Sequence, residues 1–239
     1  MPTGRRLDTW YLDTDPAITI EDTQITTCEL AQRRLTVNGR PLKVDLPQII
    51  IATRQTLAPD SRWLTAITQG DPTEPNIADP LCWLDFEHAG RNALAGEAAN
   101  LLWYLMGMGG WLVPRYQPAT YHRTLRLALP PRTTPRIEHL RASSGGRIDI
   151  HYTWNVGGGR HAALTRALHR LAPQPARFLH RTRAFLTLRI LGVIPPSRLS
   201  GEDLLLILIK AAECHTALTS TAFFHTTREH RSTHAFTPS

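Results

Sequence analysis

The chain has 239 residues, of which 42% are hydrophobic, 20% are charged and 7% are aromatic. This composition is typical of a globular protein with one large domain or two small ones, and it excludes a chain that is disordered throughout. The longest uninterrupted apolar run, Leu204–Ile209, is far shorter than the roughly 20 residues that a membrane-spanning helix needs, so no membrane partner is expected. No apolar stretch follows the charged residues at the N-terminus, which argues against a secretory signal and predicts a cytoplasmic protein.

The formal net charge is +7, which raises the question of nucleic-acid binding. Only Lys43 and Lys210 among the 27 basic residues are lysines, and the arginines are spread along the whole chain. Because binding to nucleic acid needs a clustered basic face, no nucleic-acid partner is expected. The cysteines Cys28, Cys82 and Cys214 lie far apart in the sequence, so they predict neither a cysteine zinc site nor a disulfide framework.

The first clear helical pattern covers Leu46–Leu57, with Asp45 placed to cap the helix and Pro47 in its first turn. Two short apolar runs, 63–67 and 81–84, then predict strands on either side of a polar loop. The second run ends on acidic residues, so it predicts a strand that delivers a carboxylate at its end.

Apolar residues recur at helical spacing from Leu94 to Met108 and predict a helix, which the glycines within 107–110 are expected to end. Three more helices are predicted near residues 161–171, 176–191 and 201–218, where prolines separate the helical segments. Helices therefore dominate the predicted fold.

Residues 147–156 alternate strictly between polar and apolar side chains, which predicts a strand with one buried face. Residues 123–129 and 136–140 are weaker strand candidates that could pair with it, and together they predict a small antiparallel β insertion. The glycines that follow, Gly157–Gly159, fit either an anion-binding turn at a helix N-terminus or the flexible exit from a hairpin. The absence of a Walker lysine and hydroxyl favours the hairpin exit.

The strongest chemical signal is the loop Gln69-Gly-Asp-Pro-Thr-Glu-Pro-Asn76, followed by the strand that ends at Asp85. Phosphoryl-transfer enzymes of the kinase type need a carboxylate beside the substrate hydroxyl, to orient it and accept its proton, and Asp71 suits that role. Magnesium prefers oxygen ligands, and an amide oxygen from Asn76 and a carboxylate from Asp85 suit it. The alternative is a proline-bearing surface loop in which these residues only satisfy turns.

This stretch resembles the catalytic loop of the aminoglycoside phosphotransferase and choline kinase family, which reads His-Gly-Asp, four residues, Asn, with a strand ending in Asp-Phe or Asp-Trp soon after. The resemblance implies an α+β fold, the mainly helical large lobe of a protein-kinase-like fold. It implies Asp71 as the catalytic base, Asn76 and Asp85 as magnesium ligands, and Mg²⁺ with ATP or GTP as cofactors. The implied reaction transfers a phosphoryl group from the nucleotide to a hydroxyl of a small-molecule substrate. Gly90 and Glu97 resemble the family's next landmark, where aspartate is commoner.

The chain departs from the family pattern in two ways. Gln69 stands where the family has the histidine that buttresses the backbone of the loop. The 70 residues before Asp71 show no phosphate-covering loop, strand lysine or helix glutamate of the family's small lobe. Lys43 lies directly ahead of a helix that the large lobe needs, so it is not expected to grip a nucleotide. The chain therefore resembles a large lobe without its small lobe, as in a truncated product, a fragment or half of a split enzyme.

A chain without the small lobe is expected to expose an apolar surface there, and to seek the missing lobe or a second copy of itself as partner. The alternative is that an apolar series near the N-terminus folds back onto the large lobe. Two functions stay open: a phosphotransferase that is inactive alone, and a catalytically silent large lobe that acts as a binding or partner subunit. The apolar series is Trp10, Tyr11, Leu12, Ile18, Ile20 and Ile25.

The remaining expectations concern Cys82, the histidines near the C-terminus and the division of the chain. Cys82 lies on an apolar strand and is expected to be a small core residue. The histidines His215, His225, His230 and His234 are expected to lie on the surface rather than in a metal site. The predicted segments are 1–60 (N-terminal segment and lead-in helix), 61–122 (catalytic core), 123–160 (β insertion), 161–228 (C-terminal helices) and 229–239 (frayed tail).

Overall fold

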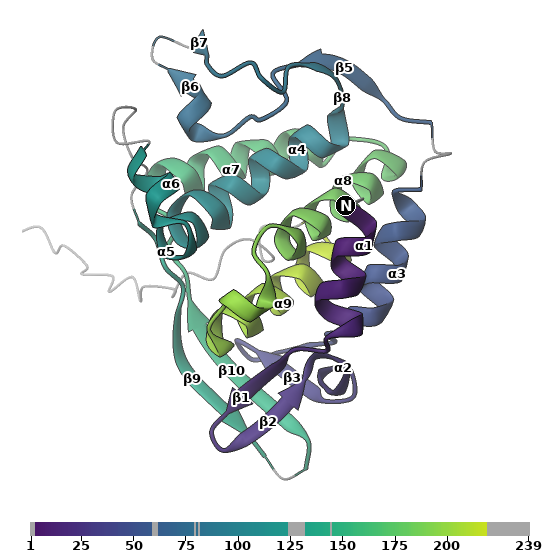
Figure 1. The fold of residues 1–239 in the computed structure, drawn as a ribbon, viewed down its shortest axis with the longest axis vertical. Coiled ribbons are helices and arrows are strands. Elements are labelled where there is room, and N and C mark those ends of the chain that lie inside the picture. The colour runs from purple at the N-terminus through teal and green to yellow at the C-terminus, as the bar shows by residue number, and fades with distance from the viewer. Residues whose placement is uncertain are drawn as a thin grey trace, which may run out of the picture.

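The computed structural model describes residues 3–58, 62–78, 80, 82–123, 132–143 and 145–218. Helices fill the middle of the molecule, a four-stranded sheet closes one end, and two short strand pairs lie at the other end (Figure 1). The α+β class predicted from the sequence is confirmed. The predicted tail at 229–239, most of the strand candidate at 123–129, and His225, His230 and His234 lie outside the described residues.

The helical elements end at only some of the prolines and glycines of the sequence. They are α1 (Thr3–Leu7), η1 (Asp8–Asp13), α2 (Thr27–Leu30), α3 (Leu46–Thr56), η2 (Glu74–Asn76), α4 (Leu94–Trp103), η3 (Tyr104–Leu112), α5 (Val113–Tyr116), α6 (Pro118–Arg123), α7 (Gly158–Leu171), α8 (Ala176–Gly192), η5 (Pro196–Arg198) and α9 (Gly201–Thr216).

The strands are short and belong to four separate sheets. They are β1 (Ala17–Ile20), β2 (Thr23–Thr26), β3 (Arg34–Val37), β4 (Arg40–Leu42), β5 (Thr65–Thr68), β6 (Ile77–Ala78), β7 (Cys82–Trp83), β8 (Gly90–Ala93), β9 (Arg136–Ala142) and β10 (Arg147–Thr153).

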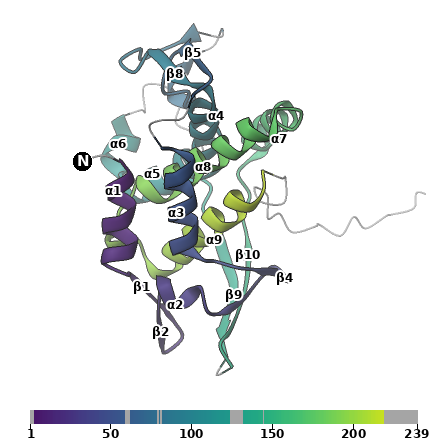
Figure 2. The ribbon, with the colours of Figure 1, turned by 90° about the vertical axis from the view of Figure 1, so that its right-hand side faces the viewer.

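The helix α9 forms the centre of the core, because apolar residues go all the way round it. Every side chain from Leu204 to Ile209 is at most 3% exposed. Helix α8 packs against α9, α4 and α3, and Figure 2 shows α3, α8 and α9 side by side. Lys210 on α9 is fully buried, and its charge is compensated by Glu213 at 2.8 Å and by the rings of Tyr152 and Trp154.

Within the described ranges, no helix is both long enough and apolar enough to cross a membrane.

The predicted strand at 147–156 is confirmed as β10, in which buried and exposed side chains alternate. Its predicted partner at 136–140 is confirmed as part of β9, which pairs with it antiparallel. On its other edge β10 pairs parallel with β3, so the sheet is mixed and has the order β4-β3-β10-β9. The antiparallel insertion is therefore joined to strands from the first part of the chain, a pairing of distant segments that a local pattern cannot show.

The apolar series near the N-terminus folds back onto the core. The expectation that this part of the chain exposes an apolar surface was therefore wrong. Tyr11, Ile18, Ile20 and Ile25 are at most 2% exposed, while Trp10 and Leu12 are partly buried against the same core. The Tyr11 hydroxyl donates a hydrogen bond to the carbonyl of Leu191 at 3.1 Å, which ties η1 to α8. The hairpin β1–β2 covers one end of α9.

The helix predicted at 94–108 does not end at its glycines, which is a second correction. It continues from α4 through the wider turns of η3 into α5. A Cβ on Gly107 would lie 2.6 Å from the ring of Trp103, and one on Gly110 would lie 2.2 Å from the Thr133 hydroxyl and 2.4 Å from the Arg160 guanidinium. Glycine is required at these positions because neighbouring groups occupy the space of a side chain, and not because the helix stops there.

Replacing Ile150 with alanine tests this core. Ile150 in β10 is 0% exposed, whereas Ile67 in β5 is 81% exposed and serves as the matched control. Ile150→Ala should lower the free energy of unfolding by about 2–5 kcal/mol, because it removes buried methyl groups and leaves a cavity. Ile67→Ala should change it by less than about 0.5 kcal/mol. Urea unfolding followed by circular dichroism measures both, and equal effects would contradict this placement of the two side chains.

Candidate functional site

The loop between β5 and β6 carries Asp71 and lies next to α4, at the end of the molecule that holds the short strand pairs (Figure 1). Two side-chain amides donate hydrogen bonds to its carboxylate: Asn76 Nδ2 to Oδ2 at 3.1 Å and Asn100 Nδ2 to Oδ1 at 2.8 Å. The same Asn76 amide group donates to the Asp71 carbonyl at 2.9 Å. The Asp71 carboxylate is therefore held in one orientation by donors from the loop and from α4.

Gln69 joins the loop to the segment that contains Asp85. Its Nε2 donates to the carbonyls of Leu84 at 3.0 Å and Asp85 at 2.6 Å, and its Oε1 accepts from the backbone N–H of Asp71 at 2.6 Å. The Leu84 N–H donates to the Asn76 carbonyl at 2.8 Å. An amide has both a donor and an acceptor, which lets Gln69 support both segments at once. The structure therefore brings Asp71, Asn76 and the backbone of Asp85 into one hydrogen-bonded network.

Gly70 is required by the close approach of two backbone segments. Its φ is +91°, and a Cβ there would lie 2.0 Å from the carbonyl oxygen of His88. Its N–H donates to Glu97 Oε2 on α4 at 3.3 Å. Glu97, noted in the sequence for its place before an apolar helix, thus contacts the backbone of the loop directly.

The Asp85 carboxylate follows β7 and is exposed. Its backbone has φ +52°, which is uncommon for a residue other than glycine. Among the described residues, no side chain pairs with this carboxylate, and no donor contacts Asn76 Oδ1. Asn76 Oδ1 in the network and the exposed Asp85 carboxylate further along the chain thus have no protein partner in the described part of the chain.

A metal ion at this loop would have to use these oxygens. No group of three or more His, Cys, Asp or Glu side chains in the described part of the chain could hold a metal ion. A cation here would therefore be held by an amide oxygen and a carboxylate, completed by water or by the oxygens of a bound substrate, which is the pattern that Mg²⁺ tolerates.

A buried ion pair, missed by the sequence analysis, fixes the far side of the loop. Arg160 Nε, at the start of α7, donates to both carboxylate oxygens of Glu74 at 3.1 and 3.0 Å. Arg160 Nη1 donates to the Thr133 hydroxyl at 3.3 Å. Glu74 lies between Asp71 and Asn76 in the sequence, so the ion pair anchors the turn that carries the amide. Burial and the Glu74 carboxylate raise the pKa of Tyr104 above its usual range, which keeps that phenol protonated.

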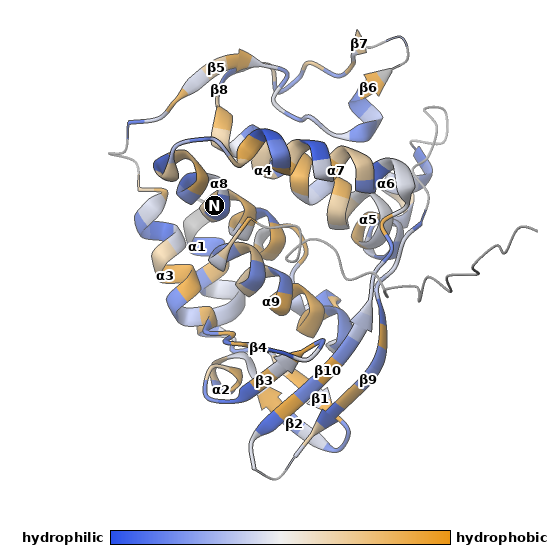
Figure 3. Ribbon diagram, turned by 180° about the vertical axis from the view of Figure 1, so that it is seen from behind, coloured by the Kyte–Doolittle hydropathy of each residue, from blue (hydrophilic) through white to orange (hydrophobic). Residues whose placement is uncertain are grey.

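Exposed apolar side chains flank the loop in the sequence, and we name them the apolar rim. Of the large hydrophobic side chains exposed in the described ranges, all except Ile51 lie between residues 64 and 86. Figure 3 shows hydrophobic residues on β5, β6 and β7 at this end of the molecule. The members of the rim are Leu64, Ile67, Ile77, Trp83 and Phe86, with exposed fractions of 62%, 81%, 36%, 39% and 61%.

The expectation that Cys82 is a core residue was wrong. Cys82 is exposed, and among the described strands β7 pairs only with the short strand β6. Cys214 on α9 is buried instead, and burial raises the pKa of its thiol to about 12. Among the described residues, neither cysteine belongs to a group of side chains that could hold a metal ion.

Comparison of the chain with models of protein families, with curated proteins and with solved structures gives no match.

Gly70→Ala tests the close approach of the loop to the His88 backbone. It should lower the free energy of unfolding by more than about 2 kcal/mol, because the new Cβ overlaps a carbonyl and the left-handed backbone disfavours it. Gly90→Ala is the matched control, since nothing lies within 4 Å of a Cβ at that position. Urea unfolding and hydrogen exchange of the Asp71 amide give the comparison. Equal stability of the two variants would contradict the loop geometry.

Proposed function

We propose that this chain is the large lobe of a phosphotransferase that phosphorylates a hydroxyl group of a small molecule. The observation that carries the proposal is the fixed Asp71 carboxylate, held by Asn76 and Asn100 and joined through Gln69 to the segment of Asp85. The order and spacing of these residues resemble the catalytic loop of aminoglycoside phosphotransferases and choline kinases. The protein-kinase-like fold is part of this proposal.

Asp71 would act as the base. Its two amide donors fix the plane of the carboxylate, so a substrate hydroxyl that hydrogen-bonds to it is oriented for attack on phosphorus. The hydroxyl proton passes to Asp71 as the new O–P bond forms and the bond from phosphorus to the leaving nucleoside diphosphate breaks. The amides also compensate the negative charge of Asp71 before the substrate arrives.

Asn76 and Asp85 fit the role of magnesium ligands. Asn76 donates through Nδ2, which turns its Oδ1 to a different side, and among the described residues neither that oxygen nor the Asp85 carboxylate has a protein partner. When bound, Mg²⁺ would neutralise charge on the phosphates of the ATP or GTP that donates the phosphoryl group.

The residues of this chain give less support for nucleotide binding than for the roles of Asp71, Asn76 and Asp85. Lys43 is exposed and pairs with Asp45 at 2.9 Å, and Lys210 is enclosed in the core with Glu213. Arg160 is engaged with Glu74. A cation that grips the α- and β-phosphates would therefore come from a partner, either a separate small lobe or a second copy of the chain. The apolar rim is the surface on which such a partner would pack, because it borders the loop and remains exposed.

A second candidate function is a catalytically silent subunit that binds a partner through the same rim. The exposed rim and the engaged lysines favour it. Asn76 Oδ1 favours the phosphotransferase, because Asn76 is only 7% exposed and this oxygen has no protein partner among the described residues.

Binding of Mn²⁺, a paramagnetic substitute for Mg²⁺, separates the two candidates. We expect Mn²⁺ at millimolar concentration to broaden the NMR signals of residues 69–76 and 82–86 selectively. Asp85→Asn should weaken this binding by about fivefold or more, roughly 1 kcal/mol, because it removes the charged ligand. Asp149→Asn, an exposed change on β10, is the control and should have no effect. Broadening that Asp85→Asn does not alter would count against the phosphotransferase.

Titration calorimetry with ATP and Mg²⁺ tests the need for a partner. The isolated chain should bind ATP at the Asp71 loop no tighter than about 1 mM, equivalent to roughly −4 kcal/mol, because Lys43, Lys210 and Arg160 are all engaged by carboxylates in the described structure. A micromolar dissociation constant would show that residues of this chain alone hold the nucleotide, and the missing-lobe part of the proposal would then be wrong.

A further inference from the structure

A hollow of about 330 Å³ lies between residues 62–64 and the beginning of α8. None of its residues belongs to the network around Asp71, so it is separate from the candidate active site. We name it the arginine hollow. It is lined by Arg62, Trp63, Leu64, Ala95, Pro175, Arg177, Phe178 and Arg181.

Arg181 is a charged group buried in this hollow without a counter-ion in the described part of the chain. Its residue is 9% exposed, its guanidinium stacks 4.3 Å from the centre of the Trp63 ring, and it donates a hydrogen bond to the carbonyl of Arg62. No described carboxylate pairs with Arg62, Arg177 or Arg181. Burial, and repulsion from Arg177, lower the pKa of Arg181. A buried charge that lacks an opposite charge is costly, so an anion at this place would stabilise the protein.

The N-terminus of α8 adds positive potential to the same hollow. This helix has 17 residues, its N-cap is Pro175, and no side chain caps it. Its first turn contains no acidic residue and carries Arg177 instead. Helix N-termini favour negative charge, so arginines at this end are unfavourable unless an anion lies beside them.

The walls of the hollow are apolar and partly aromatic. Trp63 and Phe178 line it together with Leu64 and Ala95, and the Trp63 ring is held by Phe185 at a centroid distance of 5.4 Å. We propose that the arginine hollow binds a small organic anion, a phosphate or carboxylate group attached to a planar apolar body. The arginines and the helix N-terminus would hold the charge, and the aromatic wall would hold the body.

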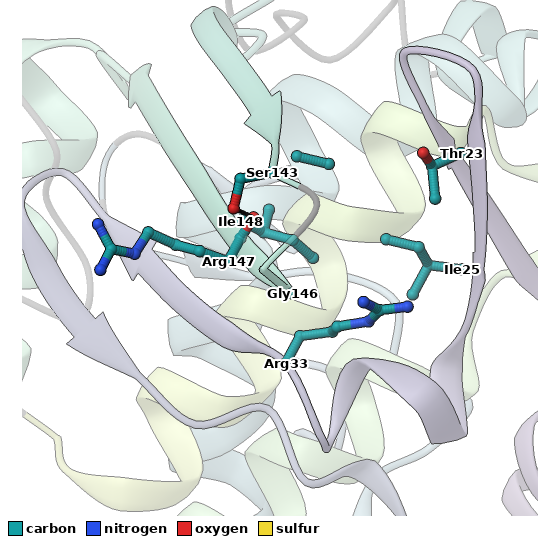
Figure 4. Close-up of a pocket in the computed structure, with 8 residues that line it drawn as sticks. Thr23, Ile25, Arg33, Ser143, Gly146, Arg147 and Ile148 are labelled. Carbon is teal, nitrogen blue, oxygen red and sulfur yellow. Dashed lines mark hydrogen bonds between the residues drawn. The ribbon is translucent and has the colours of Figure 1, made fainter.

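A second arginine-lined hollow, of about 360 Å³, does not support the same inference. It lies at the far end of the four-stranded sheet and contains Arg33 and Arg147. Figure 4 shows that these two guanidinium groups extend in opposite directions, so they do not converge on one anion. Both arginines also lack the adjoining helix N-terminus that the arginine hollow has.

NMR titration of the full-length, ¹⁵N-labelled chain tests the proposal. The probes are phenyl phosphate, inorganic phosphate and phenol, at constant ionic strength, and the signal followed is the Trp63 indole N–H, assigned with Trp63→Phe. We expect submillimolar binding of phenyl phosphate, weaker binding of inorganic phosphate and no binding of phenol. Arg177→Gln and Arg181→Gln should each weaken binding by about fivefold or more, whereas Arg189→Gln, an exposed change at the other end of the same helix, should alter it by less than about twofold.

Several results would overturn the proposal. They are the absence of a Trp63 shift with phenyl phosphate, equal affinity for phenol, and equal weakening by Arg189→Gln. Since Arg177 is exposed, its variant decides the question even where Arg181→Gln fails to fold. Asp60 lies outside the described residues, so Asp60→Asn is included. Anion binding that appears only in this variant would show that the chain's own aspartate fills the site.

Discussion

The loop from Gln69 to Asn76 satisfies only part of its polar groups by itself, and much of the surrounding structure follows from this constraint. Pro72 and Pro75 lack backbone donors, and the only regular element in the loop is a single turn. Side chains therefore replace a backbone ladder, since buried polar groups need partners. The Asp71 carboxylate is the centre of this network, because it accepts from amides on the loop and on α4.

The helices next to the loop carry side chains that supply partners for its polar groups. Glu97 and Asn100 must face the loop from α4, while Arg160 must reach Glu74 from α7. The second contact crosses the path of η3, and a side chain on Gly110 would occupy the place of the Arg160 guanidinium. The wide turns of η3 and its glycines therefore make room for a buried ion pair. Such a pair adds little net stability, but removal of one partner leaves an uncompensated charge that costs about 3–5 kcal/mol.

The features of the fold that the sequence predicted correctly are those decided by neighbouring residues. Asp45 caps α3 by accepting from the N–H of Gln48, and the alternation along 147–156 gives a strand with one buried face. The predictions that were wrong depended on distant segments. The glycines within 107–110 look like a helix end until Trp103, Thr133 and Arg160 are placed beside them. Cys82 looks like a core residue until β7 is found, among the described strands, to pair only with the short strand β6.

The contacts of the candidate site can likewise be divided into those that the sequence could predict and those that it could not. Asp71 and Asn76 are close in sequence, so their contact could be foreseen from the motif, whereas no local pattern connects them with Asn100 or Arg160. A signal for Asn100 was present, because it is the polar residue on a helix face otherwise formed by Ala99, Leu102 and Trp103. A polar side chain on a buried face needs a partner, and here the partner is the Asp71 carboxylate.

The candidate site and the arginine hollow lie at opposite ends of β5, and both adjoin α4. Asn76 Oδ1 and the Asp85 carboxylate have no protein partner among the described residues, and Arg181 on α8 lacks a counter-ion there. Leu64 belongs both to the apolar rim and to the wall of the arginine hollow. A partner that covered the rim would therefore contact one wall of the hollow. By thermodynamic linkage, an anion in the hollow and a partner on the rim would then alter each other's affinity by the same factor.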